Sequence, residues 1–254
     1  MRSPATSSRN RADPLRGDTA ASLEDAVTTG KKAEAREAIA AWISPERPVY
    51  VRINDPATEW YEDDLEAAVR PGLAGIIVPK AEDPEQLAQL ASRAGEISLI
   101  ATIETALGVW NARAVAEAPG VERLAFGSID LQLDAGITGE GEELLYARSR
   151  TVLASRVAGI LPPLDGVTVA LDDPEQLEAD VDRARRLGFG GKICIHPKQV
   201  EAVNRGFRPS QDEVYWAERV LQAAETTSSG ALKVDGELID RPVIERAKAV
   251  LERR

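Results

Sequence analysis

Leu99-Ile100-Ala101-Thr102-Ile103-Glu104 is an apolar run that ends in a carboxylate, and the chain repeats this arrangement. Three further apolar runs end in a residue that can do chemistry, at residues 49–52 (VYVR), 76–80 (IIVPK) and 124–130 (LAFGSID). Strands that close on charged residues, with helices between them, are typical of a parallel barrel whose site lies on its C-terminal rim. The sequence therefore predicts an α/β fold with cation-binding and anion-binding groups on one rim.

Composition narrows the class of protein. The chain has 254 residues, of which 43% are hydrophobic and 29% charged, which suits one large α/β domain. A net charge of −11 with scattered Lys and Arg argues against a nucleic-acid partner. The sequence has no apolar stretch long enough to predict a membrane span, and no secretory signal is expected. A single cysteine, Cys194, permits no internal disulfide and agrees with a cytoplasmic location.

The spacing of apolar runs predicts a TIM-type (β/α)8 barrel, because strands alternate with helices of ten to fifteen residues. Strands are expected at residues 48–54, 75–79, 97–104, 123–127, 166–170 and 191–195. Asp83-Pro84 and Asp173-Pro174 predict helix starts. Residues 1–21 are polar, so we expect no regular strand there and a barrel that is incomplete at its first two strands. The barrel domain is expected to cover 1–226, and 227–254 to form a C-terminal lid or oligomerisation segment.

Glu104 and Asp130 follow successive predicted strands, so their carboxylates could converge. Two carboxylates with waters suit Mg²⁺, a cation that prefers oxygen ligands. The alternative is that one or both cap a following helix or pair with an arginine, and position alone favours neither interpretation. Gly108 and Gly127 favour the functional one, because a glycine lets the backbone approach a ligand closely.

Arg52 and Lys80 supply positive charge at the same rim. A guanidinium at Arg52 could bind a carboxylate bidentately and stabilise oxyanion charge, or form a salt bridge within the rim. Lys80 could hold a phosphate or carboxylate of a substrate, form a Schiff base, or serve as a rim charge. His196 is the only histidine, so a His-rich metal site is excluded, and the residue fits a hydrogen-bonded structural role better than that of a base.

Several motifs resemble, in order and spacing, the citrate lyase β-subunit (CitE-like) branch of the HpcH/HpaI aldolase superfamily. The resemblance covers the chain from about Leu23 onward and rests on residues 51–54 (VRIN), 78–82 (VPKAE), 103–105 (IET), 126–131 (FGSIDL), 145–149 (LYARS), 191–200 (GKICIHPKQV) and 207–210 (FRPS). It implies a TIM-type barrel that binds Mg²⁺ and cleaves or forms a carbon–carbon bond in a hydroxyacyl thioester of coenzyme A.

The resemblance also implies roles for named residues. Glu104 and Asp130 match the family's metal ligands. Arg52 matches the arginine that holds the oxoacid and faces the developing enolate. Glu24 and Asp25, in Leu-Glu-Asp-Ala-Val, match an acidic signature that would support the metal and its waters.

Two further matches lie near the ends of the chain. Arg11 matches an N-terminal arginine that helps to bind the substrate. Asp240 matches a lid aspartate that reaches the neighbouring subunit's site as an acid/base group, which implies a homotrimer or a higher homo-oligomer.

The reaction that the resemblance implies is Mg²⁺-dependent cleavage of citryl-, citramalyl- or malyl-CoA to acetyl-CoA and a 2-oxoacid. Malyl-CoA hydrolysis or malate synthesis on the same site is an alternative. A citrate lyase subunit that acts on a thioester held by an acyl-carrier partner is another. The N-terminus departs from the family because its expected strands lack large apolar residues and Ser22 replaces the usual aspartate, so a non-catalytic binding homologue is also possible.

Overall fold

The computed structural model describes residues 20–46, 48–95, 97–226, 232–234 and 237–254. The chain divides into two compact units, one up to Val203 and one from Asn204 onward. The expected C-terminal segment from residue 227 thus begins inside the second unit. No helix in the described ranges is long and apolar enough to cross a membrane.

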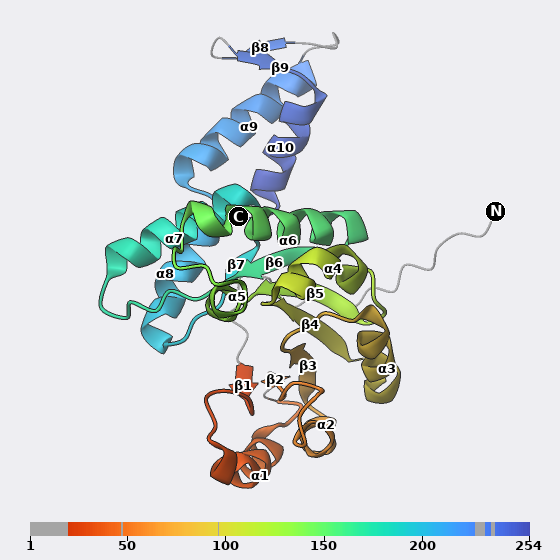
Figure 1. Ribbon diagram of the computed structural model, residues 1–254. Helices are drawn as coiled ribbons and strands as arrows, with labels where there is room; N and C mark the ends of the chain where they lie inside the picture. Colours follow the sequence, from red (N-terminus) through yellow and green to blue (C-terminus); the bar gives the residue numbers. More distant parts are fainter. Residues whose placement is uncertain (1–19, 47, 96, 227–231, 235–236) are drawn as a thin grey trace, which may run out of the picture. The chain divides into compact units, whose positions relative to one another are not determined.

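The first unit is built on seven parallel strands in the spatial order β1 to β7 (Figure 1). They are β1 Ala20–Ser22, β2 Val49–Arg52, β3 Leu73–Val78, β4 Ser98–Ile103, β5 Val121–Phe126, β6 Leu161–Asp165 and β7 Gly191–Lys192. The sheet curls into part of a barrel, so the predicted α/β fold and incomplete TIM-type barrel are confirmed. Because all strands run the same way, the residues after β2, β3, β4 and β5 meet at one rim.

Helices alternate with these strands, as predicted. They are α1 Lys32–Trp42, α2 Tyr61–Ala68, α3 Pro84–Ala94, α4 Ala106–Ala116, α5 Ser128–Ala135, α6 Leu145–Ala158 and α7 Pro174–Leu187, with short 3-10 turns η1 Thr29–Lys31 and η2 Glu142–Leu144. Two expected helix starts are confirmed. Asp83 accepts from the backbone N–H of Glu85 and Asp173 from that of Gln176, each with a proline in the first turn.

Three strand predictions differ from the structure. No strand was expected before residue 22, yet Ala20–Ser22 pairs in parallel with β2 as strand β1, because main-chain pairing needs no large side chains. The strand expected at 166–170 is wrong, since β6 lies at Leu161–Asp165 and contains two prolines that weaken the strand signal. The strand expected at 191–195 ends at Lys192, so Cys194 lies outside it and is half-buried.

The barrel interior and the layer beneath the helices are packed with branched apolar side chains. Fully buried examples from the strands and their ends include Leu23, Val49, Ile76, Leu99 and Phe126. Burying a side chain of this size contributes about 2 kcal/mol. This core fixes the strand ends and therefore the position of the polar groups that follow them.

The second unit has its own small core. It contains the end of α8 Pro197–Phe207, α9 Gln211–Thr226, the hairpin β8 Leu232–Val234 and β9 Glu237–Ile239, and α10 Arg241–Leu251. The hairpin lies within the segment 227–254, which was expected to form a lid or an oligomerisation segment. Ala217, Val220, Ile239 and Ala247 form its buried cluster, with partly buried apolar side chains around them.

Candidate functional site

Glu104 is the first residue after β4 and lies at the centre of the rim. Glu104 is 4% exposed, and its Oε1 atom accepts a hydrogen bond of 2.8 Å from the backbone N–H of Lys80. Lys80 donates from a left-handed backbone conformation, with φ of 45°, which is uncommon for a residue other than glycine. The main chain after β3 is therefore shaped to contact the Glu104 carboxylate.

The electrostatics of the rim centre on the same carboxylate. The pKa of Glu104 is raised to about 7, chiefly by burial. The negative charges of Asp130 and Glu24 also raise it, whereas the hydrogen bond from the N–H of Lys80 and the charge of Arg52 lower it. Asp130 lies in the first turn of α5, four residues after β5 rather than at the strand end itself. Three carboxylates and one guanidinium thus act on a single small volume.

Glu24 and Arg52 form an ion pair within this volume. Arg52 Nη2 lies 2.7 Å from Glu24 Oε2, and Arg52 Nε donates to Ser22 Oγ at 3.2 Å. Ser22 and Arg52 are register partners in the β1–β2 ladder, which explains their proximity. Burial raises the pKa of Glu24, although the backbone N–H of Asp25 and the charge of Arg52 oppose the shift. The pair holds the guanidinium in one orientation.

The residues present fit a hard divalent cation. No group of three or more His, Cys, Asp or Glu side chains in the described part of the chain has metal-holding geometry, so a full protein cage is not built. Mg²⁺, however, is usually held by one or two carboxylates and keeps water or substrate oxygens at its other positions. Glu104 and Asp130 supply such a pair. The pKa of Glu104 is raised first by burial and then by the charges of Asp130 and Glu24, and a bound cation would stabilise the charged form of this buried carboxylate. The donor set is that of a magnesium site with open positions.

The raised pKa of Glu104 predicts how metal-free stability depends on pH. The folded pKa of about 7 exceeds the unfolded value of 4.5, so the folded state binds the proton more tightly. This contribution is present below pH 4.5 and is lost as the pH rises through about 7, and it amounts to about 3 kcal/mol. Urea unfolding of metal-free protein at pH 5 and pH 8 should show it as a difference between wild type and Glu104→Gln. Identical pH dependence in the two proteins would contradict it.

Gly127 makes room for the Glu104 side chain. Its backbone N–H donates to Ile103 O at 3.0 Å, and a Cβ atom at this position would collide with Cβ and Oε2 of Glu104. The close approach predicted for Gly127 is thus to the Glu104 side chain.

Gly127→Ala is therefore expected to displace Glu104 and to weaken Mn²⁺ binding about tenfold or more, since misplaced ligands lose affinity on this scale. Isothermal titration with Mn²⁺ measures the change. Gly30→Ala is the matched control, because nothing lies within 4 Å of the added Cβ. Equal affinities in the two variants would show that Glu104 tolerates the displacement.

The other predicted site residues have different surroundings. Arg11 lies outside the described residues. Asp25 is exposed next to Glu24, and the Nζ atom of Lys80 lies at the rim 3.9 Å from Asp55 Oδ2. Asp240 belongs to the second unit, where its side chain accepts from the backbone N–H of Val243 at 3.3 Å and caps α10.

A buried polar network behind Glu24 was not predicted. Lys32 Nζ donates to Leu23 O at 2.7 Å, to Glu24 O at 3.2 Å and to Asn54 Oδ1 at 2.7 Å. Asn54 Nδ2 donates to Asp64 Oδ2 at 2.6 Å, and Arg36 Nε donates to Asp64 Oδ1 at 2.8 Å. Of the residues in this network, only Asn54 could be singled out from the sequence, because it is the polar residue that ends the predicted strand 48–54.

A second unpredicted cluster lies between β6 and β7. Arg148 Nε donates to Asp165 Oδ1 at 3.0 Å in a fully buried pair, and its guanidinium lies 5.2 Å from the centre of the Phe126 ring. Lys192 donates to Gly166 O, and burial lowers the pKa of Lys192. Asp165 Oδ2 is buried without a hydrogen-bond partner among the described residues. Asp165 was missed because the strand that it ends was predicted one segment too late.

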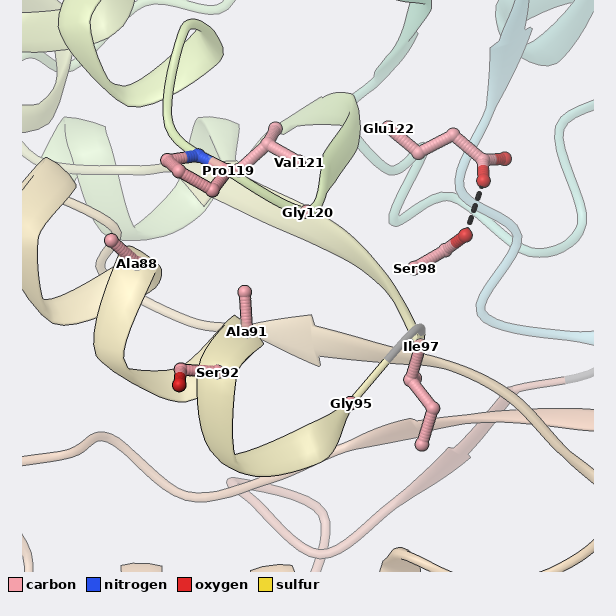
Figure 2. Close-up of a pocket in the computed structure, with 10 residues that line it drawn as sticks. All are labelled: Ala88, Ala91, Ser92, Gly95, Ile97, Ser98, Pro119, Gly120, Val121 and Glu122. Carbon is pink, nitrogen blue, oxygen red and sulfur yellow. Dashed lines mark hydrogen bonds between the residues drawn. The ribbon is translucent and has the colours of Figure 1, made fainter. Parts of the chain in front are cut away.

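A surface depression of about 590 Å³ lies away from these groups (Figure 2). It is lined by residues of α3 and by the N-terminal ends of β4 and β5, among them Ser98, Gly120 and Glu122. In a parallel sheet this end is opposite the rim that carries Glu104. None of the predicted site residues lines it. Its polar side chains are Ser92, Ser98 and Glu122, and Ser98 donates to Glu122.

Known proteins resemble this chain over most of its length. Residues 21–197 match the family described as HpcH/HpaI aldolase/citrate lyase. A citrate lyase subunit beta-like protein of Deinococcus radiodurans is 38% identical, over 90% of this chain and 86% of its own. A (3S)-malyl-CoA thioesterase of Cereibacter sphaeroides is 33% identical, over 90% of this chain and 83% of its own. The crystal structure of CitE from Mycobacterium tuberculosis with magnesium, acetoacetate and coenzyme A matches with a TM-score of 0.84 and 32% identity, over 93% of this chain and 89% of that one.

Proposed function

The chain belongs to the HpcH/HpaI aldolase/citrate lyase family and to its citrate lyase β-subunit-like branch, and from this we propose that it is a Mg²⁺-dependent carbon–carbon lyase. Its substrate would be a 3-hydroxyacyl thioester of coenzyme A, citryl-, citramalyl- or malyl-CoA. The products would be acetyl-CoA and oxaloacetate, pyruvate or glyoxylate, respectively. The complex of the Mycobacterium tuberculosis protein with magnesium, acetoacetate and coenzyme A supports both the metal and the class of substrate.

The observation that carries the proposal is the rim cluster. The pKa of Glu104 is raised to about 7, and the charges of Asp130, Glu24 and Arg52 act on it. A carbon–carbon cleavage that releases a thioester enolate needs cationic groups where negative charge develops. The cluster offers a site for a divalent cation beside Arg52. The Arg52 guanidinium is held by its ion pair with Glu24, in which Nη2 lies 2.7 Å from Oε2.

The roles that we propose for the residues rest on this cluster and on the family resemblance. Glu104 and Asp130 would hold Mg²⁺, which supplies Lewis-acid polarisation and a template for the hydroxyl and adjacent carboxylate when bound. Loss of the hydroxyl proton would turn the carbinol into the ketone of the 2-oxoacid as the carbon–carbon bond breaks. The electron pair of that bond would pass to the acetyl thioester as an enolate, and Arg52 would stabilise its charge. Protonation of the enolate carbon completes acetyl-CoA.

Five further residues complete the proposal. Asp240 would deliver the last proton as an acid/base group of a neighbouring subunit, from the lid segment 227–254. Arg11, Lys80 and Gly127 would contact the substrate. Asp25 would support the waters of the metal together with Glu24.

A homotrimer or a higher homo-oligomer in the cytoplasm is also proposed. The two adjacent helices α4 and α6 (Figure 1) carry exposed large apolar side chains, including Trp110, Tyr146 and Leu153, which supports association of copies of the chain. The molar mass of the protein in solution tests the oligomer.

The deciding experiment incubates the purified protein with Mg²⁺ and citramalyl-, citryl- or malyl-CoA in parallel reactions. The proposal expects acetyl-CoA and a 2-oxoacid in equal amounts from one substrate, and none after chelation of the metal. Free coenzyme A without an oxoacid would favour the thioesterase alternative, which the similarity to the Cereibacter sphaeroides enzyme supports. Turnover only of a carrier-bound thioester would indicate a citrate lyase subunit. No turnover of any of them would overturn the lyase proposal in favour of a binding homologue.

A further inference from the structure

Lys32 breaks a local rule of helix formation. It is the first residue of α1, where a positive charge opposes the helix dipole, and the residue is only 6% exposed. A buried ammonium in such a place lowers stability unless its donors are all used elsewhere. Violations of local preference that a fold retains tend to occur at functional sites.

All three donors of the Lys32 ammonium are used, and two of them serve one turn. Leu23 and Glu24 follow β1 in a segment without regular structure, and their carbonyl groups accept from Lys32 Nζ at 2.7 and 3.2 Å. Asn54 Oδ1 takes the third donor at 2.7 Å, and Asn54 Nδ2 also donates to Leu23 O at 2.9 Å. The ring of Trp60 covers the ammonium, with its centre 5.0 Å away.

The same turn carries the carboxylate that orients Arg52 and acts on Glu104. Leu23 N donates to Arg52 O at 2.8 Å, so the turn is anchored to β2 on one side and to Lys32 on the other. Glu24 Oε2 lies 2.7 Å from Arg52 Nη2, and the charge of Glu24 contributes to the raised pKa of Glu104.

We propose that Lys32 is a positioning residue that fixes the Glu24 carboxylate through the main-chain carbonyls of Leu23 and Glu24. This inference rests on the proposed function, because it concerns the same metal and substrate site. Lys32 touches neither metal nor substrate. It acts only through Glu24.

Loss of Lys32 would leave each of the two main-chain carbonyls with another donor, while Asn54 Oδ1 would lose its bond of 2.7 Å. Leu23 O keeps its bond from Asn54 Nδ2, and Glu24 O keeps a bond of 2.8 Å from the backbone N–H of Val27. Lys32→Met is therefore expected to fold, with a turn free to shift. Lys31→Met is the matched control, because Lys31 is the exposed neighbour in sequence.

The test is Mn²⁺ affinity, measured by electron paramagnetic resonance without any turnover. Lys32→Met should raise the Mn²⁺ dissociation constant about tenfold, as loss of an outer-sphere partner does, whereas Lys31→Met should not change it. Glu24→Gln and the double variant Glu24→Gln/Lys32→Met should bind Mn²⁺ with the same affinity, because Lys32 acts through Glu24. Circular dichroism melting verifies the fold. Lys32→Gln, which keeps a shorter donor, replaces Lys32→Met if the latter does not fold.

Two results would overturn the inference. One is a folded Lys32 variant that binds Mn²⁺ like Lys31→Met. The other is a double variant whose loss is the product of the two single losses, which a general structural effect would give. A wild-type protein that binds Mn²⁺ but cleaves no thioester would refute the proposed reaction and leave the role of Lys32 standing.

Discussion

Asp130→Asn protein is expected to lose Mg²⁺-dependent thioester cleavage, with kcat/KM lowered about 1000-fold or more. Removing one of two carboxylates deprives the metal of half its protein ligands, and a loss of about 4 kcal/mol in transition-state stabilisation corresponds to this factor. The measurement is release of 2-oxoacid at saturating Mg²⁺, coupled to a dehydrogenase. Asp130 lies in the first turn of α5 and is half-buried, so the isosteric amide should leave the fold unchanged.

Asp134→Asn is the matched control for this variant. Asp134 lies one turn further along α5, where its Oδ2 atom accepts from the backbone N–H of Ala106 at 2.7 Å, a contact that the asparagine oxygen can keep. Activity near that of wild type is expected. An Asp130→Asn protein that cleaves substrate as fast as this control would eliminate Asp130 as a metal ligand. A secondary sign is a lower pKa of Glu104 in Asp130→Asn, because the charge of Asp130 raises it.

Arg52→Lys is expected to lower kcat about 100- to 1000-fold, which is the usual effect of removing one donor to a developing oxyanion. Arg52 contacts Glu24 through Nη2 and Ser22 through Nε. These two contacts fix the plane of the guanidinium and therefore the direction of its remaining N–H groups. Lysine keeps the charge but lacks the fork, and its ammonium cannot make the same contacts together. Steady-state kinetics with the active thioester measure the loss, and Mn²⁺ affinity should change only a few-fold.

Arg93→Lys serves as the comparison for Arg52→Lys. Arg93 forms an exposed ion pair with Glu62 outside the site, where such pairs contribute little. Its kinetics should equal those of wild type. If kcat of Arg52→Lys stays within tenfold of this control, Arg52 stabilises no charge in the rate-limiting step.

The strands that could be predicted are those whose side chains form a clear apolar run. The runs that become β2, β3, β4 and β5 are apolar, and each is followed by or ends in a charged residue, so Glu104 and Arg52 could be assigned to the rim. β1 and β6 were missed for physical reasons. Ala20–Ser22 is too small and polar to show a strand pattern, and two prolines mask the strand Leu161–Asp165.

Only the charged residues at the ends of the apolar strands of the site were predictable from the sequence pattern. Asp130 could be located near Glu104 because both follow neighbouring strands, whereas Glu24 was found through the family resemblance alone. Lys32 lies in an Ala-rich charged segment, where a lysine normally belongs to the solvent face of a helix. Its burial depends on contacts with Leu23 and Asn54, which lie 9 and 22 residues away in the chain. Periodicity cannot reveal such contacts.

The left-handed backbone at Lys80 has a consequence for engineering the substrate range of this protein. The group that holds Glu104 is the N–H of the peptide bond, so it survives replacement of the Lys80 side chain by any amino acid except proline. Glycine should even relieve strain of about 1 kcal/mol at φ of 45°. Position 80 can therefore be randomised in a library, with side chains of any charge presented to an incoming thioester and the carboxylate below them still held by the main chain.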